Sequence, residues 1–296
     1  PWQPRLAAQV TDDSQWPDCI AVPTASGKTA CIDIAVFALA CQASRPPGQR
    51  TAPRRIFFVV DRRVIVDEAF ERAKHLANEL AKAEGGVLRE VADALRELSR
   101  DSDAPPLDAY QLRGGIYRDD SWVRSPLQPT VIASTVDQVG SRLLFRGYGV
   151  SDNAKPIHAA LIGNDSLIVL DEGHCAQPFR DTATAVDRYR GENWAEKPLG
   201  MPFQFVEMSA TPRNGTSAFH LDDDDKTHPV LSARRDAPKP ALLSVAKGAS
   251  GKNALPKLAR HLHDKAEELA GAEAVPQAIA IIVNRVRTAK LLHERL

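Results

Sequence analysis

The chain has 296 residues, which is long for one domain and predicts about two. Hydrophobic residues make up 43% of it and charged residues 26%, a balance typical of a soluble globular protein. Lys plus Arg and Asp plus Glu are equal at 38 each, so the formal net charge is zero. The chain as a whole therefore has no net positive charge that would attract a polyanion such as DNA. A nucleic-acid site would have to be a local basic patch.

The cysteines and the apolar runs indicate where the protein resides. The four cysteines, at positions 19, 31, 41 and 175, include no C-x-x-C pair, which favours buried reduced thiols over a zinc site. Reduced thiols fit a reducing cytoplasm. We find no signal peptide and no apolar run of membrane-spanning length, so we expect a cytoplasmic protein without a membrane partner.

Short runs rich in Val and Ile alternate with helical patterns along the chain. The runs lack apolar and polar alternation, so both of their faces should be covered, as in a parallel sheet. Residues 30–41 are apolar nearly all round, and residues 64–83 and 88–98 have one apolar face each. This order predicts a doubly wound α/β domain. The predicted strands are residues 19–22, 56–60, 131–134, 167–170, 205–209 and 279–283.

The pattern changes after residue 213. Residues 214–255 contain a run of four aspartates and several prolines, and we expect an irregular segment that acts partly as a linker. A helix over residues 255–270 and the strand at 279–283 then predict the start of a second α/β domain in residues 256–296. The chain begins without Met and stops within a helical pattern, so we expect it to be a piece of a longer protein.

The segment "VPTASGKT", residues 22–29, follows a predicted strand and precedes a buried helix, which is the context of a phosphate-binding loop. Lys28 would lie between the β- and γ-phosphates of ATP, and the Thr29 hydroxyl would bind Mg²⁺. Val22 departs from the usual glycine but ends the strand. Ala25 has to avoid a positive φ or accept a small strain. The nucleotide-binding candidates are Thr24, Ala25, Ser26, Gly27, Lys28 and Thr29.

Two further strands end in polar residues. The segment "LIVLDEGHCAQ" delivers Asp171 and Glu172 to a strand's carboxyl end, where Asp171 would hold Mg²⁺ through water and Glu172 would act as general base. The segment "FVEMSATPR" places Ser209 and Thr211 at the same edge. Ser209, Thr211 and His174 are therefore candidates to couple binding and hydrolysis of the nucleotide to movement of the protein.

In their order, the three segments resemble motifs I, II and III of superfamily-2 DExH helicases. The resemblance implies a RecA-like first ATP-binding domain over residues 1–213 and a RecA-like second domain that begins at residue 256. Gly173 replaces the alanine of the D-E-A-H box, and we expect it to loosen the loop. "PWQPRL" resembles the upstream glutamine motif, which implies that Gln3 contacts adenine.

The same resemblance suggests where DNA would bind. "VVDRRVIVDEA", "LRGG" and "IASTVDQVGSR" resemble motifs Ia, Ib and the T-x-D-Q segment, and "AIIVNRVRTAKLL" resembles motif IV. For each arginine the alternative is an ordinary solvated surface residue. The candidates to contact single-stranded DNA are Arg62, Arg63, Arg113, Thr135, Gln138 and Arg142.

Within that superfamily, "STVDQ", "VNRVRTA" and "PTASGKTACIDIAVFALA" make the chain similar to the CRISPR-associated helicase–nuclease of type I systems, in the type I-G (formerly I-U) branch. The resemblance implies ATP- and Mg²⁺-dependent translocation and unwinding of single-stranded DNA, with a Cascade-type effector complex as partner. His263-Asp264 is the only adjacent His-Asp pair, and we expect it on an exposed helix face. The HD nuclease domain and the rest of the helicase are then expected elsewhere in the parent protein. Because motifs V and VI are missing, we expect this segment alone to be inactive.

Two other functions remain open on the sequence. One is a different superfamily-2 motor, such as a restriction or repair translocase. The other is an ATP-gated scaffold that recruits an effector complex without moving along DNA. Intact Lys28 and Glu172 favour a motor over a scaffold, since a scaffold need not keep both.

Overall fold

The computed structural model describes residues 1–12, 15–101, 103–115, 119–173, 176–210, 217–238, 241–251, 254–271 and 278–295. The chain forms two compact units, Pro1–Ala237 and Pro238–Leu296, and each is described by itself. Among the described residues, none of the helices has the length and apolar character needed to cross a membrane.

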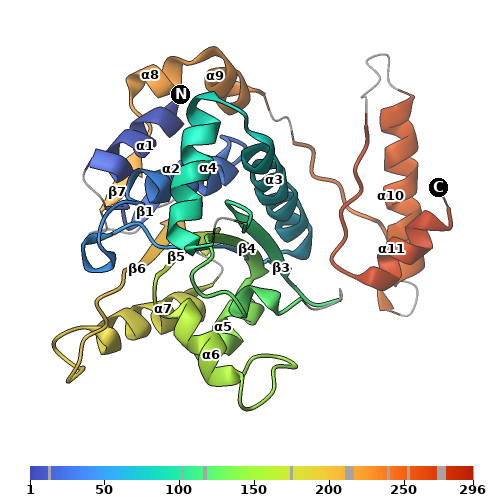
Figure 1. Cartoon of the computed structure of the whole chain (residues 1–296). Helices are drawn as coiled ribbons and strands as arrows, with labels where there is room; N and C mark the ends of the chain where they lie inside the picture. The colour runs from blue at the N-terminus through green and yellow to red at the C-terminus, as the bar shows by residue number, and fades with distance from the viewer. Residues whose placement is uncertain are drawn as a thin grey trace. The chain divides into compact units, whose positions relative to one another are not determined.

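The first unit is built on one sheet of seven strands in the described part of the chain (Figure 1). Every neighbouring pair is parallel, and the order is β3-β4-β2-β5-β6-β1-β7. The predicted doubly wound α/β fold is therefore confirmed. The strands are β1 (Cys19–Ala21), β2 (Arg55–Val60), β3 (Asp108–Leu112), β4 (Thr130–Thr135), β5 (Ser166–Asp171), β6 (Phe203–Met208) and β7 (Ala218–His220).

Helices cover both faces of this sheet because its central strands are apolar on both sides. In β2, Ile56 and Phe58 enter the core beneath α1 to α4, whereas Phe57 and Val59 enter the core beneath α5 to α7. The helices are α1 (Trp2–Asp12), α2 (Cys31–Cys41), α3 (Arg63–Lys82), α4 (Gly86–Ser99), α5 (Val136–Leu143), α6 (Lys155–Ile162) and α7 (Gln177–Arg190).

The segment predicted to be an irregular linker, residues 214–255, is partly regular and belongs in part to the first unit. Strand β7 pairs with β1, and it is followed by α8 (Asp223–Thr227) and α9 (Pro229–Asp236). Asp222 caps α8 through the backbone N–H of Asp225, and Arg5 of α1 forms an ion pair with Asp222 at 2.9 Å. Two of the aspartates that suggested an irregular segment, Asp222 and Asp225, thus cap a helix and hold it to α1. The unit extends to Ala237 rather than to residue 213.

The second unit contains α10 (Ala254–Ala270) and α11 (Val286–His293). The predicted strand at 279–283 is wrong: these residues form no strand, and the described part of this unit offers no strand for them to pair with. Ile279 and Ile281 instead line an apolar cavity with residues of both helices. His263 and Asp264 lie on α10, and the prediction of an exposed helix face is confirmed for Asp264, whose side chain is 65% exposed, but not for His263, whose side chain is 21% exposed.

The cysteines follow the sequence-based expectation in part. Cys19 and Cys31 are free and buried, and burial raises the pKa of both thiols, which keeps them protonated. Cys41 is also free but exposed, because it ends α2 on the side away from the core. Cys175 lies outside the described residues.

Candidate active site

The phosphate-loop segment connects β1 to α2 with two residues in left-handed conformations. Gly27 has φ 82°, which suits glycine, but Ala25 has φ 63°, so it takes the small strain that its Cβ imposes. Val22 is fully buried in the core beneath α2. The unusual first residue is thus a packing residue at the end of β1, and the loop proper begins after it.

Helix α1 lies against this loop. The indole N–H of Trp2 donates to the Ser26 carbonyl at 2.9 Å, and the side-chain amide of Gln3 donates to the same oxygen at 3.5 Å. The Ser26 hydroxyl donates to the Pro23 carbonyl at 2.5 Å. The structure therefore brings Gln3 to the loop, while Thr24 and Ala25 stay exposed.

Lys28 joins the phosphate loop to the acidic strand end. Its Nζ lies 3.0 Å from Oδ1 of Asp171 and 3.4 Å from Oε1 of Glu172, and its side chain is only 7% exposed. The backbone N–H of Glu172 donates to Asp171 Oδ1 at 3.1 Å, and Glu172 has φ 52°, a conformation rare outside glycine. Residues 144 positions apart in sequence thus form one cation–carboxylate cluster around a buried lysine.

The strand order explains this convergence. Strand β6 lies between β5 and β1, so the ends of all three meet at one place on the carboxyl edge, which we call the nucleotide half. Ser209 is fully buried at the end of β6, and its backbone N–H donates to the Ile20 carbonyl of β1 at 3.2 Å. Thr29 lies in the turn that leads into α2. His174 and Thr211 lie outside the described residues.

One residue near the loop was not predicted. Arg234 of α9 donates from Nη1 to the Ala25 carbonyl at 2.6 Å. No motif covers α9, and the segment was expected to be irregular, so no sequence signal pointed to this contact. It places a guanidinium directly beside the strained loop residue.

The ends of β2, β4 and β3 form the other part of the same edge, which we call the basic half. Arg62 and Arg63 are exposed at the start of α3. The Arg63 guanidinium lies over Gly114, where an ideal Cβ would be 3.1 Å from Nη2. Arg113 Nε is 2.6 Å from the Asp67 carboxylate. Three of the predicted DNA-binding arginines are therefore brought together, and one of them is already paired.

Of the remaining DNA-binding candidates, Arg142 and Thr135 are buried and Gln138 is half-buried. Arg142 is fully buried, and it donates to the Gln138 side chain at 2.6 Å and to His158 Nδ1 at 3.2 Å. Thr135 is 6% exposed. The prediction that Arg142 contacts DNA is therefore wrong, because its face of α5 turns toward α6 and the core; the same network occupies the side chain of Gln138.

A cavity of about 340 Å³ connects the two halves. Thr24, Asp171 and Glu172 line it from the nucleotide half, and Asp61, Arg62 and Ile65 line it from the basic half. A ligand held at the phosphate loop would therefore share one opening with Arg62.

No protein-family model matches this chain. A search of curated proteins also gives no match. Functional assignment therefore rests on the residues themselves and on the geometry of the two halves.

Proposed function

We propose that the protein is an ATP hydrolase of the DExH helicase type that moves along single-stranded DNA. The observation that carries the proposal is the position of Lys28, within 3.0 Å of Asp171 and 3.4 Å of Glu172. A loop lysine and two carboxylates, gathered at the strand ends of a parallel sheet, are the groups that hydrolysis of a nucleoside triphosphate uses.

The donor set fits Mg²⁺·ATP. The backbone of the loop around left-handed Gly27 offers N–H groups to phosphate oxygens, and Lys28 offers its ammonium, for which a phosphate would compete with the two carboxylates. Thr29 and Asp171 would hold Mg²⁺, which supplies charge neutralisation on the phosphates. Glu172 would orient the attacking water and accept its proton. Gln3, next to Ser26, would contact the adenine.

The basic half supports a nucleic-acid partner. Exposed Arg62 and Arg63 and the half-buried Arg113 would contact strand phosphates, which gives affinity without sequence preference. The cavity shared by Arg62 and Glu172 gives a physical route by which DNA would affect hydrolysis. From the resemblance to CRISPR-associated helicases, we further propose a cytoplasmic motor that acts with a Cascade-type effector complex and an HD nuclease domain.

The test is ATP hydrolysis by the full-length protein, with and without single-stranded DNA. We expect DNA to stimulate hydrolysis, and Glu172→Gln to lower kcat by about 10²-fold or more, because it removes the base. Glu90→Gln, an exposed change on α4, is the matched control. If DNA does not change the rate of hydrolysis, or if the protein does not hydrolyse ATP, an ATP-gated scaffold would be favoured over a motor.

A further inference from the structure

Gly173, the last described residue of the acidic turn 171–173, has no room for a side chain. An ideal Cβ at this position would lie 2.3 Å from Cγ and 2.5 Å from Cδ of Glu207 on β6. Unbonded carbon atoms pack at about 3.5–4.0 Å, so the two side chains cannot share this space. The glycine that replaces the alanine of the D-E-A-H pattern is therefore a packing requirement, and it does not loosen the turn as the sequence suggested.

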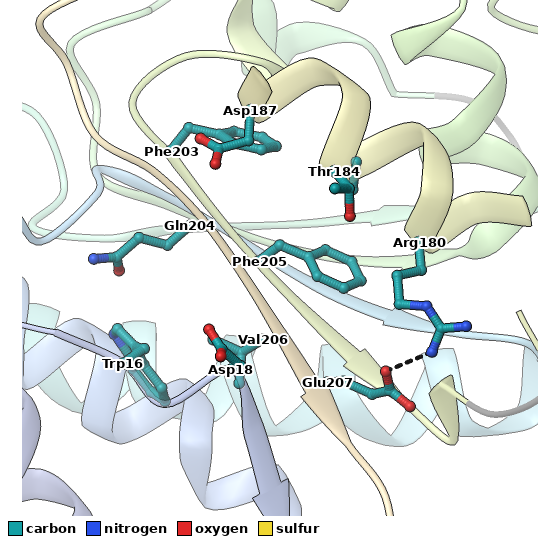
Figure 2. A pocket seen from close by; sticks show the side chains of 11 residues that line it. Trp16, Asp18, Arg180, Thr184, Asp187, Phe203, Gln204, Phe205, Val206 and Glu207 are labelled. Carbon is teal, nitrogen blue, oxygen red and sulfur yellow. Dashed lines mark hydrogen bonds and ion pairs between the residues drawn. The ribbon is translucent and has the colours of Figure 1, made fainter. Parts of the chain in front are cut away.

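Glu207 is held in this place by Arg180 of α7 (Figure 2). Oε2 of Glu207 is 2.9 Å from Nη1 of Arg180, and the two side chains are only 12% and 10% exposed. The pair lies at the wall of a cavity of about 380 Å³, which gives the carboxylate an alternative position. Moving there would take the paired carboxylate away from a buried guanidinium and leave it the neutral Gln177 side chain as acceptor, which is unfavourable, so Glu207 stays against Gly173.

This contact touches the turn that holds the proposed general base. Glu172 directly precedes Gly173 and has the left-handed φ of 52°, a conformation that its surroundings must maintain. Glu207 lies two residues before Ser209, whose backbone bonds to β1. The contact between Gly173 and Glu207 therefore links the acidic turn to the strand that carries the Ser-Ala-Thr segment.

We propose that Glu207 and Arg180 are positioning residues for the ATPase reaction. The Glu207 side chain, held by Arg180, supports Gly173 and keeps the Glu172 carboxylate directed at Lys28. The inference rests on the proposed function. Both residues act through the turn rather than on ATP itself.

A kinetic cycle with Gly173→Ala and Glu207→Ala tests the contact in the full-length protein. We expect each single variant to lower kcat by about tenfold with little change in KM, because Glu172 is displaced while the phosphate loop is intact. In the double variant, the new Cβ at position 173 fills space that Glu207 vacates. We therefore expect its kcat to exceed that of either single variant. Thermal unfolding of each protein checks that the variants are folded.

A second pair of variants separates shape from charge and does not depend on the alanine variants folding. Glu207→Gln keeps the length of the side chain and an acceptor for Arg180, so we expect it to retain most of kcat. Glu207→Asp keeps the charge but withdraws from Gly173, so we expect it to lose activity. The inference would be overturned if the loss of kcat in the double variant equalled the product of the losses in the two single variants. It would also be overturned if Glu207→Asp were active and Glu207→Gln inactive. A wild-type protein without ATPase activity would instead reject the proposed function.

Discussion

The nucleotide half and the basic half of the sheet edge hold their predicted residues in different ways. At the ends of β5 and β1, Asp171, Glu172 and Lys28 form one cluster although they are far apart in sequence. At the ends of β2, β4 and β3, the arginines divide: Arg63 is exposed and Arg142 is fully buried. The end of β5 places Asp171 and Glu172 directly, and the loop after β1 returns Lys28 to them. The position of Arg142 depends instead on how α5 packs, and that packing buries it.

The largest expected effect concerns the cluster in the nucleotide half. Lys28→Ala removes the cation that the structure places between two carboxylates, so we expect kcat/KM for ATP to fall by about 10²–10³-fold. Steady-state hydrolysis measures this, and Lys82→Ala, an exposed lysine on α3, is the control. If Lys28→Ala hydrolysed ATP as the wild type does, the cluster would be structural and the proposed site would be lost.

The next effect is on stability and comes from the basic half. Arg142→Ala removes a fully buried guanidinium that donates to His158 and Gln138 and pairs with Asp120, so we expect it to destabilise the protein by about 3 kcal/mol. That corresponds to a decrease of roughly 6–12 °C in Tm for a unit of this size. Thermal unfolding measures it, and exposed Arg146→Ala should leave Tm unchanged. A folded, stable Arg142→Ala protein with weakened DNA binding would restore the original prediction.

These two halves also show what the sequence could predict. Apolar runs such as residues 56–60 predicted the central strands, because a strand buried on both faces is apolar nearly throughout. The edge strand Asp108–Leu112 was missed because it is only partly buried and has a mixed composition. Gly173 and Glu207 could not be connected from sequence, since their contact depends on the pairing of β5 with β6. Motif spacing predicted which residues meet, but not which side chains fill the space between them.

A smaller effect would sharpen the role of the exposed arginines. Arg63→Ala should weaken binding of single-stranded DNA and reduce the slope of log K against log salt by about 0.7, the value for one phosphate contact. Titrations of labelled single-stranded DNA at several salt concentrations measure this slope. Arg89→Ala, an exposed arginine on α4 that pairs with Asp93, is the control. An unchanged slope would place the DNA path away from Gly114 and the start of α3.

The smallest expected effect tests whether the nucleotide half includes α9. Arg234 donates to the Ala25 carbonyl at 2.6 Å, so Arg234→Ala should free the strained loop. We expect it to weaken ATP binding by about fivefold, which corresponds to the net value of one typical hydrogen bond. Binding of a fluorescent ATP analogue measures the change. Arg235→Ala is a close control, because its side chain pairs with Asp236 at 2.8 Å rather than with the loop. If both variants bound the analogue equally well, the contact with Ala25 would not contribute to nucleotide affinity, and the nucleotide half would depend on the sheet ends and α1 alone.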